Sequence, residues 1–124
     1  MKTSLIKEKS YLFALAIVGL YKTLLKQNEF VLSKQLLKSG TSIGANVEEA
    51  LAGQSRADFL SKMSIASKEA RETNYWLRLL GDSEIVSKTE TDPLLAESEL
   101  IANILSAIVK TTQNSKPKTL LPLF

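Results

Sequence analysis

Acidic and amide side chains recur at helical spacing in the middle of this chain, where they could bind a metal ion or form a polar network. Asn46 and Glu49 lie three residues apart, and Glu69 and Glu72 repeat that spacing. Side chains three residues apart share one face of a helix. Carboxylates on facing helices could hold Mg²⁺ or Mn²⁺, because both ions prefer oxygen ligands.

Two residue types are absent from the chain, and their absence limits the kinds of metal site and catalytic site that it can form. None of the 124 residues is histidine or cysteine. Di-iron bundles use Glu-x-x-His motifs, so that centre is excluded, as is a Ser-His-Asp triad. A chain without cysteine has no disulfide or thiolate site and fits a reducing cytoplasm. We predict no catalytic residue, metal or cofactor, and interpret the carboxylates as a structural network paired with Lys68, Arg71 or Arg78. An all-carboxylate metal site is the alternative.

Basic residues concentrate in the first third of the chain. The formal net charge is +3, but residues 1–38 carry seven lysines against Glu8 and Glu29. Four of these lysines form two pairs at a spacing of four, which places each pair on one helix face: Lys22, Lys26, Lys34 and Lys38. Such pairs suit phosphate contact without sequence readout, so we predict that they bind nucleic acid. Solubility is the alternative role.

Apolar periodicity predicts four helices, at about 4–27, 31–51, 55–80 and 93–113. The predicted stripe of the first helix comprises Leu5, Leu12, Phe13, Ala16, Ile17, Leu20 and Leu24. Residues 82–91 are mostly polar and predict a loop, with Pro93 at the first turn of the last helix. Short connections favour antiparallel neighbours, so the predicted fold is all-α, an antiparallel up-down-up-down four-helix bundle. Residues 1–114 form the bundle, and 115–124 form a tail that packs on it or meets another chain.

Three local features refine this prediction. Gly40 and Gly44 lie inside the second helix and favour a close helix crossing. Ser55, with Asp58 three residues later, is a helix-capping pattern. The apolar run 11–21 follows several lysines and resembles a signal peptide, but its 11 residues are too few to span a bilayer, which needs about 20. We interpret the run as a buried helix face.

Three segments of the sequence resemble one known family: Gln35–Ala50, Asp58–Met63 and Ala66–Leu77. The family is the bacterial four helix bundle protein family, also called 23S rRNA intervening-sequence or S23 proteins, and the resemblance extends over about residues 5–112. It implies a ring-shaped homopentamer related to accessory proteins of diversity-generating retroelements, which bind nucleic acid and a reverse transcriptase. The asparagine and glutamates of the family pattern fall on Asn46, Glu49, Glu69 and Glu72.

The sequence therefore predicts a non-enzymatic, cytoplasmic, homo-oligomeric scaffold that binds RNA or DNA. An alternative function is an adaptor that binds another protein, such as a reverse transcriptase, and no nucleic acid. A third is a metal-dependent enzyme built on Glu49, Glu69 and Glu72. No membrane association is predicted.

Overall fold

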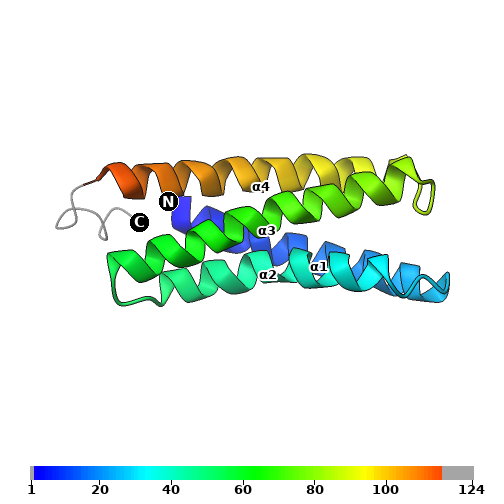
Figure 1. The fold of residues 1–124 in the computed structure, drawn as a ribbon, viewed down its shortest axis with the longest axis horizontal. Helices are drawn as coiled ribbons and strands as arrows, with labels where there is room; N and C mark the ends of the chain where they lie inside the picture. The colour runs from blue at the N-terminus through cyan, green and yellow to red at the C-terminus, as the bar shows by residue number, and fades with distance from the viewer. Residues whose placement is uncertain (1, 116–124) are drawn as a thin grey trace.

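The chain folds into four antiparallel helices (Figure 1). The computed structural model describes residues 2–115, so most of the predicted tail, at 116–124, lies outside the described residues. Successive helices pack against each other, whereas the first and last pack less extensively. The described residues contain no strand, which confirms the all-α four-helix prediction. The helices are α1 (Lys2–Lys26), α2 (Leu32–Leu51), α3 (Arg56–Asp82) and α4 (Lys88–Asn114).

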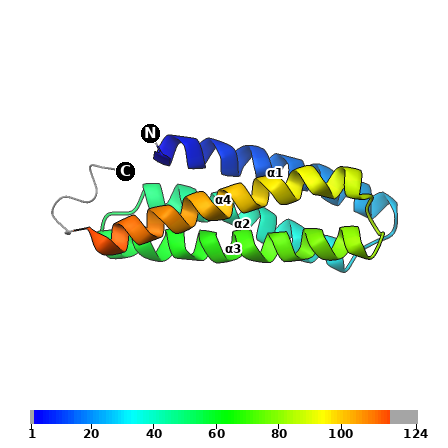
Figure 2. The ribbon, with the colours of Figure 1, turned by 90° about the horizontal axis from the view of Figure 1, so that it is seen from above.

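All four helices contribute side chains to one core. The largest fully buried ones are Ile6, Ile17, Leu24, Leu36, Ile43, Met63, Leu77, Leu80, Ile101, Leu105 and Ile108. In α1 the predicted stripe is partly wrong. Leu5 and Leu12 are 47% and 55% exposed, and the core instead receives Ile6 and Ser10. Because α1 packs little against α4, one flank of α1 stays uncovered (Figure 2).

The glycines of α2 set how closely α1 approaches. A Cβ atom on Gly40 would lie 2.8 Å from Cγ2 of Ile17, well inside van der Waals contact. A Cβ atom on Gly44 would lie 3.4 Å from the backbone oxygen of Ser10. The predicted close crossing is confirmed, and Gly40 is its tightest point.

The loop between α1 and α2 contains a capping carboxylate. Asn28 has φ 61°, in the left-handed region that asparagine tolerates. The Glu29 carboxylate then accepts from the backbone N–H groups of Val31, Leu32 and Ser33, the last at 2.6 Å. Partial burial alone would raise the pKa of Glu29, but these N–H groups lower it below its ordinary value. Glu29 therefore caps α2.

The start of α3 was predicted correctly and that of α4 was not. Ser55 caps α3 by accepting from the Asp58 N–H at 3.0 Å. The α4 helix begins at Lys88, so Pro93 lies inside it and much of the predicted loop is helical. Thr91 is buried against Gly81, and this packing stabilises a first turn whose polar residues carry no apolar signal. Within residues 2–115, no helix has the length and apolar character needed to cross a membrane.

Candidate nucleic-acid interface

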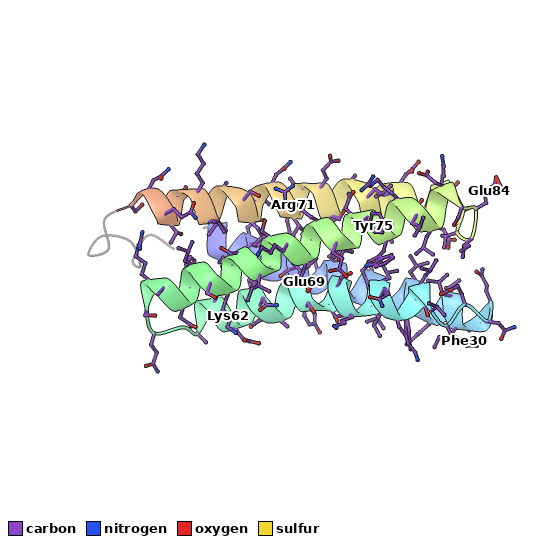
Figure 3. The ribbon with its side chains drawn as sticks, viewed as in Figure 1. Phe30, Lys62, Glu69, Arg71, Tyr75 and Glu84 are labelled. Carbon is purple, nitrogen blue, oxygen red and sulfur yellow. The ribbon has the colours of Figure 1, made fainter. Side chains whose placement is uncertain are left out.

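The four predicted phosphate-binding lysines lie at one end of the bundle. Lys22 and Lys26 occupy the last turns of α1, and Lys34 and Lys38 the first turns of α2. All four are exposed. Because α1 and α2 are antiparallel and joined by a short loop, both pairs lie near that loop, where Figure 3 labels Phe30. We call these four lysines the basic end.

Few carboxylates neutralise the basic end. In the part of the chain that the structure describes, no carboxylate oxygen lies within 4 Å of any of the four lysine ammonium groups. The nearby Glu29 is engaged with the N-terminus of α2, where its charge is balanced by backbone N–H groups. Lys38 lies close enough to Glu69 to lower the pKa of that carboxyl. The other three ammonium groups can meet external anions.

The predicted polar network divides into local contacts. The Asn46 side-chain amide donates to the Ser42 carbonyl at 2.8 Å, one turn back in α2. Glu49 is exposed and forms an ion pair with Lys62 of α3 at 2.9 Å. This pair joins the two helices at the surface, where an ion pair contributes at most about 1 kcal/mol.

The other two members of that network lie on α3. Burial raises the pKa of the Glu69 carboxyl, the Glu72 carboxylate adds to this, and Lys38 opposes it. Glu72 is exposed and accepts from the Trp76 indole N–H at 3.0 Å. Among the described residues, no hydrogen bond links Asn46 or Glu49 to Glu69 or Glu72.

A buried polar contact that we did not predict joins the same two helices. The hydroxyls of Thr73 and Ser39 lie 2.9 Å apart, and both residues are buried. Each also has a backbone partner on its own helix, the carbonyls of Glu69 and Leu36. The sequence contained a signal for this buried contact, because Ser39 falls at helical spacing between Leu36 and Ile43, on the apolar stripe of α2.

The predicted pairing of α3 arginines with these carboxylates is wrong. Arg71 donates to the Ser106 hydroxyl of α4 at 3.0 Å, and the Arg78 Nε donates to Asn74 at 3.1 Å. Figure 3 shows Arg71 on the α4 side of α3 and Lys62 and Glu69 on the α2 side. Seven-residue spacing places Arg71 and Arg78 on the same face, away from α2.

Metal ligands do not gather in the described residues. Between residues 2 and 115, no three Asp or Glu side chains lie where they could share a metal ion. The exposed Glu49 and Glu72 have the partners described above, Lys62 and Trp76.

Comparisons with known proteins agree with the fold. Residues 2–107 match the family described as 23S rRNA-intervening sequence protein. The chain belongs to this family. It is also similar to a crystal structure from Bacteroides thetaiotaomicron VPI-5482, described as a protein with unknown function from the S23 ribosomal protein family. The two are 50% identical with a TM-score of 0.86, and the match covers 89% of this chain and 99% of the other. No curated protein matches.

Family membership confirms the resemblance found in the sequence. All the predicted site residues, in the basic end and in the polar network, lie inside the matched range 2–107. The similar structure is described as having unknown function, so it supports the fold and names no ligand.

Proposed function

We propose that this protein is a non-enzymatic, homo-oligomeric scaffold of the cytoplasm that binds RNA or DNA through phosphate contacts. The observation that carries the proposal is the basic end, with four exposed lysines and no carboxylate oxygen within 4 Å of them among the described residues. Phosphate binding by such lysines releases counterions and needs no base-specific contact.

Self-assembly is supported by the uncovered flank of α1. Leu5, Leu12 and Leu15 are 47%, 55% and 52% exposed, and their spacing of seven and three places them along one face. Apolar side chains gathered on one face mark interaction surfaces. The family resemblance implies five copies. Light scattering should give five times the 13.7 kDa of one chain, and a particle of single-chain mass would contradict this part of the proposal.

Nucleic-acid binding is tested by removing the basic end. Changing Lys22, Lys26, Lys34 and Lys38 to glutamine lowers the net charge of each chain from +3 to −1. A matched control changes four lysines that already form ion pairs, which are Lys7, Lys9, Lys62 and Lys88.

We expect the basic-end variant to lose RNA affinity and the control to keep most of it. If all four lysines contact phosphates of a single strand, the slope of log affinity against log salt in the parent should be about −3. Equal losses in both variants would show that net charge alone matters. A folded basic-end variant that binds like the parent would exclude these lysines.

A second function is favoured by the same flank of α1. If the parent binds neither RNA nor DNA at low salt, the exposed leucines suit an adaptor that binds another protein, such as the reverse transcriptase that the resemblance implies. Leu12→Lys and Leu15→Lys together should then abolish partner binding, measured by co-purification with that partner.

A further inference from the structure

Two neighbouring hollows lie along the seam between α3 and α4. The first hollow, of about 250 Å³, is lined by Arg71, Asn74, Arg78, Ser98, Glu99, Ala102 and Asn103. A second hollow, of about 470 Å³, lies beside Ser67, Lys68, Ser106 and Lys110. A hydrogen bond connects the two linings: Arg71 of the first hollow donates to the Ser106 hydroxyl of the second at 3.0 Å, and that hydroxyl lies 3.4 Å from the Ser67 hydroxyl. We call both hollows together the arginine groove.

The arginine groove carries a net positive charge. Four cations line it, which are Lys68, Arg71, Arg78 and Lys110, and Glu99 is the acidic residue in its lining. In the described part of the chain, no carboxylate oxygen lies within 4 Å of either guanidinium. Of the predicted carboxylate partners, Glu49 pairs with Lys62 and Glu72 accepts from Trp76, so the fold leaves these charges available to a ligand.

A relay of hydrogen bonds holds Arg78 in place. The buried Ser98 hydroxyl donates to the Leu95 carbonyl and accepts from the Asn74 amide at 3.0 Å. The oxygen of the same Asn74 side chain accepts from the Arg78 Nε at 3.1 Å. This bond uses one of the five guanidinium donors and leaves the terminal N–H groups available. A guanidinium held in this way suits two-point recognition of a phosphate.

The length of the groove favours a strand over a single anion. Its lining on α3 extends from Ser64 to Arg78, about 21 Å at 1.5 Å per residue. Hydroxyl and amide groups lie between the cations and could bind ribose hydroxyls. Tyr75 lines neither hollow but adjoins Arg78: it is 48% exposed, and the guanidinium carbon lies over its ring, 5.8 Å from the centroid. An exposed aromatic ring next to a cation is a platform on which a base can stack.

We propose that the arginine groove binds a single RNA strand, with Arg71 and Arg78 each holding a phosphate and Tyr75 stacking on a base. This inference rests on the proposed nucleic-acid function and names a second surface for the strand. The groove runs along α3 toward the end of the bundle where the basic end lies (Figure 1). A strand could therefore contact both surfaces.

The three arginines of the chain provide a direct test. Arg56, Arg71 and Arg78 can each be modified by phenylglyoxal and quantified by mass spectrometry. Arg56 serves as the internal control, because it lines neither hollow and its guanidinium is already engaged by the Thr112 carbonyl at 2.8 Å. Excess single-stranded oligouridine should protect Arg71 and Arg78 and leave the modification of Arg56 unchanged. Equal protection of all three, or of none, would overturn the proposal.

Affinity measurements test RNA binding by the arginine groove separately from nucleic-acid binding by the basic end. Arg71→Gln with Arg78→Gln should weaken oligouridine binding at least about tenfold. Each substitution removes hydrogen bonds between a charged guanidinium and a phosphate, which contribute more free energy than bonds between neutral groups. The charge-matched control, Lys62→Gln with Lys88→Gln, should change affinity much less. Arg71→Lys with Arg78→Lys keeps the charge, and it should still weaken binding because the planar fork is lost. Circular dichroism checks that each variant is folded.

The possible failures are distinguishable. If the double glutamine variant binds RNA like its control while the basic-end variant does not bind, the groove is excluded and the proposed function stands. If the parent binds no RNA at low salt, both proposals fail. If inorganic phosphate or single-stranded DNA protects Arg71 and Arg78 as well as oligouridine does, the assignment to an RNA strand is wrong.

Discussion

Replacing Gly40 by alanine tests the close packing of α1 against α2. The new Cβ atom would lie 2.8, 2.9 and 3.2 Å from three side-chain atoms of Ile17, including its Cβ. Ordinary carbon contacts begin at about 3.5 Å, so α1 and α2 would have to separate by several tenths of an ångström. Because Ile17 Cβ is fixed to the backbone, a rotamer change alone cannot relieve the overlap.

Two opposing effects determine the magnitude. Alanine stabilises a helix interior by about 1 kcal/mol relative to glycine. Overpacking a well-packed core costs about 1–3 kcal/mol. Gly19 isolates the first effect, because it lies on the exposed side of α1 and a Cβ atom there meets nothing within 4 Å. We expect Gly19→Ala to stabilise the protein, and Gly40→Ala to be less stable than Gly19→Ala by about 1–3 kcal/mol.

Thermal unfolding followed by circular dichroism measures this difference, at one fixed protein concentration because assembly affects Tm. The two variants should differ by roughly 4–12 °C for a chain of this length. In an Ile17→Ala background the contacts at 2.8 and 2.9 Å are removed and only the 3.2 Å contact with Cβ remains, so Gly40→Ala should cost much less there than in the parent. A Gly40→Ala variant as stable as Gly19→Ala would refute the packing argument.

Two further predictions concern the polar contacts of α2. Thr73→Val leaves the buried Ser39 hydroxyl without its 2.9 Å partner and should cost about 1 kcal/mol in urea unfolding. Adding Ser39→Ala should cost less than the sum of the single changes, and strict additivity would contradict a coupled pair. Glu29 has a lowered pKa in the folded state, so its stabilisation is complete above its unfolded pKa of roughly 4.3 and is lost as pH falls through the lower folded value. The stability difference between parent and Glu29→Gln should therefore be larger at pH 7 than at pH 3, and the same difference at both values would exclude this cap.

Local patterns predicted the elements well where the chain interacts with itself over one or two turns. Ser55 and Asp58 predicted the start of α3, because capping depends on residues three apart. Gly40 and Gly44 predicted a close crossing, because a residue without a side chain lets a neighbouring helix approach closely. The start of α4 was missed because its first turn is stabilised by contact of Thr91 with Gly81, ten positions earlier in the chain.

The partner of each charged side chain was harder to predict. The sequence places Arg71 and Glu72 on the same predicted helix, but it does not show which neighbouring helix packs against each face of that helix. The fold directs Arg71 and Arg78 to α4, so the arginine groove became visible only in the structure. The carboxylates of α2 and α3 likewise formed local pairs at the surface.

The sequence by itself determined the helical fold, the family, the glycine crossing and the exposed lysines of the basic end. These depend on periodicity, composition and short-range spacing, which the chain carries without reference to distant residues. Only the tertiary structure decided which flank of α1 is uncovered, that Ser39 meets Thr73, and that the α3 arginines line a groove with α4. Those outcomes depend on the rotation of each helix about its axis, which is set by how all four helices pack together.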